Sequence, residues 1–335
     1  MKKLFLLVTV LFLSLSLAGC AEEKVLTIYF VPSRDAAEIL TATEPLKQML
    51  IDELADLGYV YDKVEIFVGS SYEAAAEAMI SGQAEIGFLP GGTYVLYSEG
   101  GEIDVALTAT RGGLSKDSPN AKAWNDGLAT EADAAYQVTY YRGLVIAGPS
   151  AKGQAVAAKV NSGADLVWAD LSGLTWCVRS ATSSSGYIYP NIYLMSMFDK
   201  TFDDLPSAQV IQTDGYGTSM GNLAAESCDV ATFYADARRD YAAKWEDSAE
   251  GFSRSASIWT ETNVVIVTDP IYNDTISVSS DITIGLKMAI QTAFINIAKT
   301  TEGKEIIAIY SHQGYKKAND SDYDNERIAQ ELLGN

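Results

Sequence analysis

The chain has a single histidine, His312, among its 335 residues. Catalytic triads and most zinc sites need imidazole side chains at positions spread through a sequence. The chain also lacks a carboxylate-dense motif of the kind that metal-dependent hydrolases use. We therefore expect no catalytic residues, no metal site and no cofactor, and we predict that the protein is not an enzyme.

Basic residues are scarce as well. There are 24 lysines and arginines against 44 aspartates and glutamates, which gives a formal net charge of -20. Nucleic acids and anionic membrane surfaces repel a protein of this charge. We therefore expect no nucleic-acid partner, and we attribute the acidity to a need for solubility.

Long apolar runs are missing except at the N-terminus, where the chain begins MKKLFLLVTVLFLSLSLAGC. Two lysines precede an apolar stretch at 4–17 that is short for an ordinary spanning helix. The ending Leu-Ala-Gly-Cys looks like a bacterial lipobox, so we predict a signal peptide at 1–19 and lipidation of Cys20. An ordinary signal peptide or an anchor helix is the alternative. The body would then lie outside the cytoplasm, tethered to the membrane by the lipid.

Only two cysteines, Cys177 and Cys228, lie in the predicted mature body. An oxidising compartment would allow them to pair. Each one, however, sits beside an apolar run typical of a strand (LTWCV and CDVATF), where free buried cysteines are common. We therefore expect two free, buried thiols.

Strands and helices alternate along the chain in two series, which predicts parallel β-α-β units. A segment at 112–135, rich in glycine and small polar residues, interrupts them and is expected to be a long surface loop or insertion. In the first series we expect strands at 24–31, 63–68, 84–89 and 103–110, and helices at 36–57, 74–80 and 94–98. In the second series we expect strands at 174–179, 208–212 and 228–233, and helices at 186–198 and 219–226.

The two series predict an α/β protein of two lobes with a ligand cleft between them. An extended segment at 255–269 returns the chain toward the first series, and helices follow at 282–299 and 303–310. We assign 20–142 plus 260–335 to lobe 1 and 143–259 to lobe 2. Hinge crossings are expected near 143–148 and 254–262.

Hydroxyl side chains cluster in the stretch SATSSSGYIYP, between a predicted strand and a predicted helix. The first turn of a helix has free N–H groups and partial positive charge, which favour an anion. We predict that Ser183, Ser184, Ser185 and Gly186 hold an anionic ligand through hydroxyls and close backbone approach. Simple helix capping is the alternative, but it requires only one hydroxyl.

Two further predicted helix starts carry small donors followed by a tyrosine. Ser70-Ser71-Tyr72-Glu73 resembles a capping box with Ser70 at the N-cap. Pro90-Gly91-Gly92-Thr93-Tyr94 follows a strand, and no Gly-Lys-Ser/Thr follows it, so it is not a phosphate-binding loop of the Walker type. We expect Ser71, Tyr72, Thr93 and Tyr94 to contact the ligand, although packing is the alternative for each tyrosine.

The chain resembles the phosphate-, phosphite- and phosphonate-binding proteins of ABC importers, the PhnD-like group. SATSSSGYIYP, the most specific motif, resembles the S-T-S-G-[FY]-x-x-P of that family. The other motifs are LAGC, SSYEAAAEAMISGQAEIGFLPGGTYVL, YYRG and GNLAAESCDVATF. The resemblance implies a type II periplasmic-binding-protein fold, a phosphorus oxyanion as ligand, and an ABC permease and ATPase as partners of a monomer. It assigns the phosphonate oxygens to Ser183, Ser184 and Ser185, and two ligand-binding tyrosines to Tyr72 and Tyr94.

The chain departs from this family where aminophosphonate-binding members hold the ligand ammonium. Gly217 aligns with their acidic residue, and Tyr234 aligns with a position that is often Asp or Asn. An amino group would lack a charge partner there. We therefore expect phosphite, methylphosphonate, phosphate or a larger phosphonate in an aromatic-lined site, with Tyr234 as a contact. Asp214 or Asp236 remains an alternative ammonium partner.

Three arginines, Arg34, Arg111 and Arg142, are candidates for neutralising the anion, and ion pairing is the alternative for each. Two other functions stay open on the sequence. The same fold could bind a different small molecule, such as a vitamin precursor or an amino acid, or the protein could be a surface-anchored phosphoester or phosphonate hydrolase.

Overall fold

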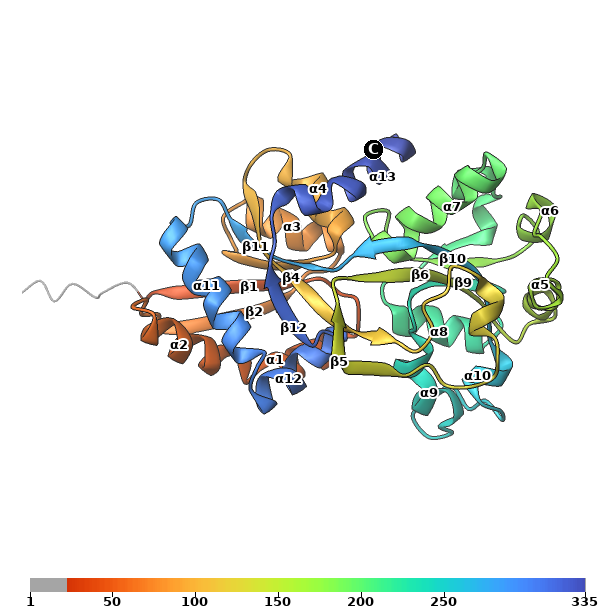
Figure 1. Cartoon of the computed structure of the whole chain (residues 1–335), viewed down its shortest axis with the longest axis horizontal. Coiled ribbons are helices and arrows are strands. Elements are labelled where there is room, and N and C mark those ends of the chain that lie inside the picture. Colours follow the sequence, from red (N-terminus) through yellow and green to blue (C-terminus); the bar gives the residue numbers. More distant parts are fainter. Residues whose placement is uncertain (1–22, 335) are drawn as a thin grey trace, which may run out of the picture.

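A computed structural model describes residues 23–334 and divides the chain into two lobes, each built on its own sheet (Figure 1). The larger sheet has the order β12-β4-β11-β3-β1-β2 with β5 paired to β4, and the smaller has the order β10-β6-β9-β7-β8. The two-lobe α/β architecture is therefore confirmed. The larger sheet contains β1 (Val25–Phe30), β2 (Lys63–Val68), β3 (Ile86–Leu89), β4 (Ile103–Leu114), β5 (Ala132–Val138), β11 (Thr275–Ser279) and β12 (Gly314–Lys317). The smaller contains β6 (Tyr140–Ala147), β7 (Trp176–Val178), β8 (Val210–Gln212), β9 (Val230–Tyr234) and β10 (Asn263–Tyr272).

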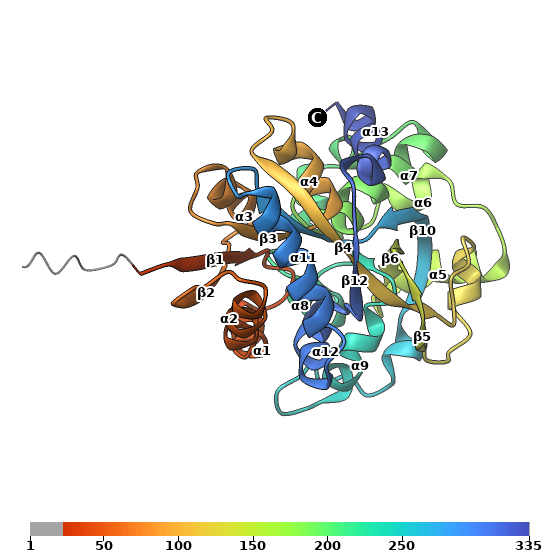
Figure 2. The same ribbon diagram turned by 60° about the vertical axis from the view of Figure 1, so that its left-hand side comes forward.

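Helices cover both sheets, and α13 (Asp324–Leu333) lies between the lobes, next to α4 (Gly91–Ser98) and α7 (Tyr189–Phe198) (Figures 1 and 2). Lobe 1 contains α1 (Ala36–Thr43), α2 (Leu46–Asp56), α3 (Tyr72–Ile80), α4 (Gly91–Ser98), α11 (Ile284–Ile297) and α12 (Thr301–Ile307). Lobe 2 contains α5 (Ala151–Ser162), α6 (Trp168–Leu171), α7 (Tyr189–Phe198), α8 (Tyr216–Ala224), α9 (Arg238–Glu246) and α10 (Ile258–Glu261). In the described part of the chain, no helix combines the length and apolarity needed to cross a membrane.

The expected single helix at 36–57 is two helices, and this prediction was wrong in that respect. Pro45 stands between α1 and α2 at the N-cap of the second helix. A proline has no N–H to continue a helical ladder, so a break before Leu46 is the physical outcome.

Parallel strand pairs direct the loops of both lobes toward the cleft. In lobe 1, β1 pairs parallel with β2 and β3. In lobe 2, β7 pairs parallel with β8 and β9. The carboxyl ends of parallel strands meet at one edge of a sheet, which is where open α/β sheets bind ligands. The segments after β1, β3, β7 and β8 therefore supply the walls between the lobes.

The chain crosses between the lobes close to Thr139 and Asn273. Strands β6 and β10 pair antiparallel from Ala147 with Asn263 to Tyr140 with Tyr272, wholly within the smaller sheet. The crossings therefore lie outside the hinges expected near 143–148 and 254–262, because both strands keep pairing up to the lobe boundary. The backbone N–H of Asn273 donates to the Thr139 carbonyl at 2.9 Å and holds the two crossings together.

The segment expected to be a loop at 112–135 is partly a β-hairpin. Strand β4 continues to Leu114, and β5 pairs antiparallel with its end. The connection carries a 3₁₀ turn (Ala121–Trp124) whose Trp124 side chain is buried in the core of lobe 2. The side chain of Asn125 fixes the connection to lobe 2 by accepting from the Val264 N–H at 2.7 Å. This hairpin therefore spans both lobes at one side of the cleft.

Cys177 and Cys228 form a disulfide with a Cα–Cα separation of 5.8 Å, so the expectation of two free thiols was wrong. Cys177 lies in β7, and Cys228 lies just before β9. These strands are neighbours in the smaller sheet, which brings the two buried residues together. A pair of this kind is typical of proteins in oxidising compartments.

Alkylation of the unfolded but unreduced protein is expected to label neither Cys177 nor Cys228, because the thiolate is the nucleophile and a disulfide has none. Reduction before alkylation should expose both residues to the reagent. Peptide mass mapping of the two samples measures the difference. Full labelling without reduction would contradict the pairing.

Candidate functional site

A cavity of about 50 Å³ lies between the lobes, and we call it the inner cavity. Roughly 10–15 Å³ of such space accommodates one water molecule, so the inner cavity has the scale of a small oxyanion. Its lobe 1 wall follows β1, β3 and β4 and includes Tyr72 from α3. Its lobe 2 wall comes from β6, β9, the start of α8 and residues 180–188, which we call the serine loop. The lining residues are Val31, Ser33, Arg34, Tyr72, Phe88, Leu89, Pro90, Arg111, Tyr141, Ser183, Ser185, Tyr216, Tyr234, Asp274, Tyr310, Ser311 and His312.

Hydroxyl groups form one side of the inner cavity. The Tyr216 hydroxyl lies 2.9 Å from the Ser185 Oγ and 3.3 Å from the Ser183 Oγ. Tyr72 faces this group from the other lobe and is also buried. Hydroxyl hydrogens rotate to suit their acceptors, so these four groups can donate to the oxygens of an anion.

The backbone of the serine loop explains why two serines of the run face the cavity. Ser184–Ile188 forms a π-helical turn before α7 rather than the start of an ordinary α-helix. The Ile188 N–H donates to the Ser183 carbonyl at 3.0 Å, which widens the turn. Gly186 is necessary at this point, because a Cβ there would overlap the side chain of Arg179.

Arg179 provides a buried positive charge behind the hydroxyl groups. Its side chain is 2% exposed and lies against the rings of Tyr72 and Tyr216, at 5.3 and 5.4 Å from their centroids. It donates to the backbone carbonyls of Thr213 and Pro32. It makes no ion pair with any residue of the described chain. A buried charge without a counter-ion is unfavourable, and it favours a bound anion nearby.

Arg111, Asp274 and His312 form a second charged group on the lobe 1 side. Arg111 donates to the Asp274 carboxylate at 2.7 Å, and His312 Nε2 lies 3.2 Å from the same oxygen. Burial would raise the pKa of Asp274, but Arg111 and His312 hold it below its ordinary value. Burial lowers the pKa of His312, which keeps its ring neutral at neutral pH. The group therefore combines one cation with one anion.

Arg34 and Tyr234 share a carboxylate at the mouth of the inner cavity. Arg34 and the Tyr234 hydroxyl each donate to Asp240 at 2.6 Å. The ion-pair alternative for Arg34 and Arg111 is thus the arrangement observed. Both arginines still line the inner cavity, where their remaining N–H groups contribute positive potential.

Ser184, predicted to hold the ligand, does not line the inner cavity. Its Oγ accepts from the Gly92 N–H at 2.9 Å and donates to Glu326 at 3.1 Å. Gly92 belongs to α4 of lobe 1, so this serine joins the lobes. Gly186 also lies behind the cavity surface, where its carbonyl accepts from Thr232 at 2.6 Å.

Three other predicted contacts lie away from the inner cavity. The Tyr94 hydroxyl donates to Asp320 at 2.7 Å, and its ring is buried in the core of lobe 1 against Tyr323. Thr93 bonds the carbonyl of Thr182 at 3.3 Å. Ser71, rather than Ser70, is the N-cap of α3 and accepts from the Ala74 N–H.

The two alternative ammonium partners are also engaged elsewhere. Asp214 accepts from the Thr218 hydroxyl on an exposed turn, and Gly217 lies outside the inner cavity. Asp236 forms a fully buried ion pair with Arg238 at 2.7 Å. Neither carboxylate faces the inner cavity. Among residues 23–334, no three His, Cys, Asp or Glu side chains gather as a set of metal ligands.

Sequence reasoning missed Arg179, Tyr216 and Asp274. Arg179 stands at the end of a predicted strand immediately before the serine loop, which is a readable signal. Tyr216 stands beside Gly217 in the run GYGT, at the start of a helix. Asp274 gave no comparable signal, because its importance arises from its place at the crossing between the lobes.

Comparison with protein families gives a match over most of the chain. A family model described as "ABC transporter, phosphonate, periplasmic substrate-binding protein" matches residues 28–323. A binding protein component of an ABC phosphonate transporter from Pseudomonas aeruginosa has 14% sequence identity and a TM-score of 0.64, covering 92% of this chain and 86% of its own.

Two further solved structures share the fold. PhnD1 from Prochlorococcus marinus, in complex with methylphosphonate, has 13% identity and a TM-score of 0.64, covering 93% of this chain and 98% of its own. Mh-p37 from Mycoplasma hyorhinis, proposed to transport thiamine pyrophosphate, has 16% identity and a TM-score of 0.69, covering 92% and 98%. Identities this low show the fold alone and confirm the type II periplasmic-binding-protein architecture. The family match shows more, and the chain belongs to the periplasmic substrate-binding proteins of ABC phosphonate transporters.

Proposed function

We propose that this protein captures a phosphorus oxyanion in the inner cavity and delivers it to an ABC permease. The observation that supports this most strongly is the buried Arg179, which has no carboxylate partner and lies behind four hydroxyl groups. Its charge makes the cavity attractive to an anion, and the hydroxyls of Ser183, Ser185, Tyr72 and Tyr216 would contact the oxygens.

The carboxylate that lines the inner cavity indicates which ligand substituents the cavity can accept. Asp274 is the carboxylate that lines the inner cavity, and it is already neutralised by Arg111. An ammonium group placed beside it would compete with that arginine. We therefore favour phosphite, methylphosphonate, phosphate or a larger phosphonate over 2-aminoethylphosphonate.

The solved neighbours support the same class of ligand. The Prochlorococcus protein is in complex with methylphosphonate, and the Mycoplasma protein is proposed to transport thiamine pyrophosphate. Both ligands carry a tetrahedral phosphorus oxyanion, although their substituents differ greatly in size.

Isothermal titration calorimetry against phosphite, methylphosphonate, phosphate and 2-aminoethylphosphonate tests the proposal. At least one of the first three is expected to bind with micromolar or lower Kd, which corresponds to about -8 kcal/mol or better. 2-Aminoethylphosphonate is expected to bind at least about tenfold more weakly than the best of them, a difference of about 1.4 kcal/mol. Absence of binding by all four ligands at millimolar concentration would overturn the proposal.

We also propose that the protein is a monomeric lipoprotein anchored through Cys20. This cysteine lies outside the described residues. Strand β1 begins at Val25, five positions after Cys20, at the end of lobe 1 far from lobe 2 (Figure 1). A lipid there would hold lobe 1 close to the membrane. Metabolic labelling with a palmitate analogue should tag the wild type and not Cys20→Ala, and equal labelling of both would contradict the anchor.

A further inference from the structure

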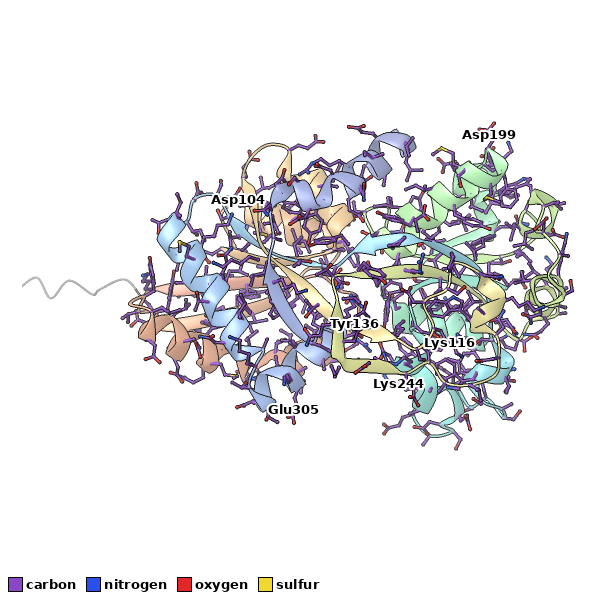
Figure 3. All side chains as sticks on the ribbon, in the orientation of Figure 1. Asp104, Lys116, Tyr136, Asp199, Lys244 and Glu305 are labelled. Carbon is purple, nitrogen blue, oxygen red and sulfur yellow. A yellow bond between two sulfur atoms is a disulfide. The ribbon has the colours of Figure 1, made fainter. Side chains whose placement is uncertain are left out.

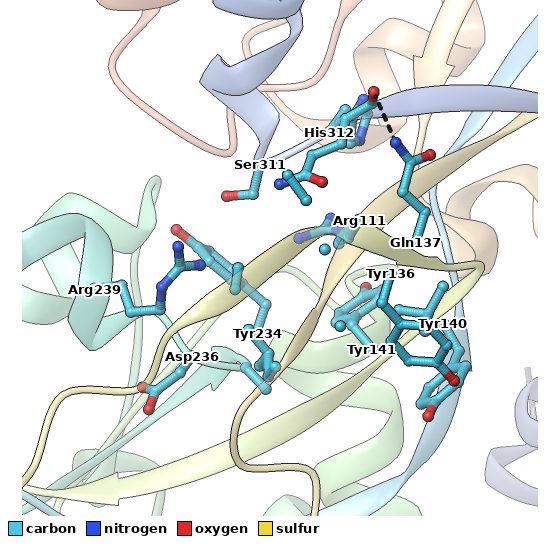
Figure 4. Close-up of a pocket in the computed structure, with 18 of the residues that line it drawn as sticks. Arg111, Tyr136, Gln137, Tyr140, Tyr141, Tyr234, Asp236, Arg239, Ser311 and His312 are labelled. Atoms are coloured by element: carbon cyan, nitrogen blue, oxygen red, sulfur yellow. Dashed lines mark hydrogen bonds between the residues drawn. The ribbon is translucent and has the colours of Figure 1, made fainter.

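A second, larger cavity of about 620 Å³ adjoins the inner cavity, and we call it the outer chamber (Figure 4). The two share Arg111, Tyr141, Tyr234, Ser311 and His312 in their walls. Sites for organic ligands usually enclose about 300–1,000 Å³, whereas methylphosphonate would occupy only the inner cavity. The outer chamber is therefore large enough for an organic group attached to the oxyanion.

The hairpin of β4 and β5 builds one wall of the outer chamber. Tyr136 lies on β5 between the lobes (Figure 3), and its side chain is 64% exposed. Its ring rests on Gly113 of β4, where a Cβ would overlap the ring. Tyr140 and Tyr141 lie on the same side of the chamber in Figure 4. This wall consequently presents aromatic surface to the cleft, an arrangement suited to planar groups.

The charges in the outer chamber do not cancel. Asp117 pairs with Arg142, Asp236 with Arg238, and Asp240 with Arg34. Arg239 and Lys304 also line the chamber, and within residues 23–334 neither makes an ion pair.

Two cations without partners at the mouth of a cleft are notable in a chain whose net charge is -20. Arg239 comes from α9 of lobe 2 and Lys304 from α12 of lobe 1, so an anion between them would contact both lobes. Because no carboxylate in the described part of the chain neutralises either of these two cations, both would attract the negative charge of a ligand.

We propose that the outer chamber binds the substituent of a larger organic phosphonate or phosphate ester. The substituent is planar or aromatic and carries an additional negative charge. This inference rests on the proposed function, because the inner cavity would hold the phosphorus oxyanion while Tyr136, Tyr141 and Tyr234 contact the organic group. Arg239 and Lys304 would receive its second charge.

Calorimetry with methylphosphonate, benzylphosphonate and 4-carboxybenzylphosphonate tests the inference. Benzylphosphonate is expected to bind about tenfold more tightly than methylphosphonate, because the ring buries apolar surface. The added carboxylate is expected to improve affinity about threefold more at low ionic strength, and added salt should remove that gain.

Matched variants assign these gains to residues. Tyr136→Ala should abolish most of the affinity that benzylphosphonate gains over methylphosphonate. The affinity for methylphosphonate should stay within about twofold of the wild-type value. Phe67→Ala, which removes a 41% exposed aromatic ring from β2, serves as its control and should change neither affinity. The double variant Arg239→Gln, Lys304→Gln should abolish the affinity that 4-carboxybenzylphosphonate gains over benzylphosphonate. The control double variant Lys316→Gln, Lys317→Gln on β12 should keep that gain.

The outcomes separate the two proposals. If methylphosphonate binds and benzylphosphonate binds no more tightly, the inference about the outer chamber is wrong and the proposed function stands. If benzylphosphonate gains affinity that Tyr136→Ala leaves intact, the chamber wall described above is not the binding surface and the inference is again overturned. If none of the three ligands binds at millimolar concentration while phosphite or phosphate does, the inference about the outer chamber is wrong and the proposed function stands. If phosphite and phosphate also fail to bind, both proposals fail.

Discussion

Replacing Ser183 and Ser185 together by alanine is expected to weaken binding of methylphosphonate, phosphite or phosphate by about two to four orders of magnitude. A hydrogen bond to a charged group contributes about 1.5–3 kcal/mol, and the double variant removes two such donors. The loss is expected to be this large because both hydroxyls are buried, so an anion oxygen that loses them is left without a hydrogen-bond donor in a desolvated site. Calorimetric Kd values for the wild type and the variant measure it.

Two controls distinguish lost contacts from a disturbed fold. Ser196→Ala removes an exposed hydroxyl from α7 and should leave the affinity unchanged. Ser184→Ala removes the bond to Gly92 across the lobes and is expected to weaken binding less than the double variant, because its hydroxyl does not line the inner cavity. A double variant that melts like the wild type and still binds within about threefold of it would contradict the assigned role.

The sequence predicted where the serine loop lies but not which of its serines line the inner cavity. Its place between a strand and a helix followed from residue patterns, because capping and amphipathic signals are local. The orientation of each hydroxyl depends on the π-helical turn at Ser184–Ile188, which turns Ser184 toward lobe 1. Sequence patterns do not specify such a turn, since its widened hydrogen bonds depend on packing against Arg179.

Long-range partners were the other information missing from the sequence. Arg34 of lobe 1 pairs with Asp240 of lobe 2, and Arg111 pairs with Asp274, which is 163 positions away in the chain. The disulfide has the same origin, because Cys177 and Cys228 meet through neighbouring strands. The two-lobe fold itself was predictable, since the residue patterns that indicate each strand and helix lie within short stretches of the sequence.

Glu326 is a buried carboxylic acid at the junction of the two lobes. It lies on α13, is fully buried, and accepts from the Ser184 hydroxyl of lobe 2 at 3.1 Å. Its side chain also packs where a Cβ on Gly91 of lobe 1 would stand. Burial raises the pKa of Glu326 from 4.5 to about 7, although Tyr189 and Ser184 lower it and the charge of Asp274 raises it further.

The sign of the resulting pH dependence follows from proton binding. Below about pH 4.5 Glu326 is protonated in both the folded and the unfolded chain, so stability does not change through this group. Between about pH 4.5 and about pH 7 the folded protein keeps a proton that the unfolded chain has lost, so the free energy of unfolding falls as pH rises. Across this range the free energy of unfolding falls by about 3 kcal/mol through Glu326. Above about pH 7 the contribution of Glu326 no longer changes with pH.

Glu326→Gln is expected to remove this loss while keeping an acceptor for Ser184. The unfolding free energy of the variant relative to the wild type should therefore rise by about 3 kcal/mol between about pH 4.5 and about pH 7. Urea unfolding at several pH values measures both curves. Their difference isolates Glu326 from His312, whose lowered pKa acts in the opposite direction in part of this range.

Glu331→Gln, an exposed change on the same helix, provides the matched control and should give a curve parallel to that of the wild type. Parallel curves for Glu326→Gln and the wild type would mean that Glu326 loses its proton at the same pH in the folded and the unfolded chain, which would contradict the raised pKa expected from its burial. A rising difference would instead show that folding takes up a proton at Glu326, which is buried by contacts from both lobes.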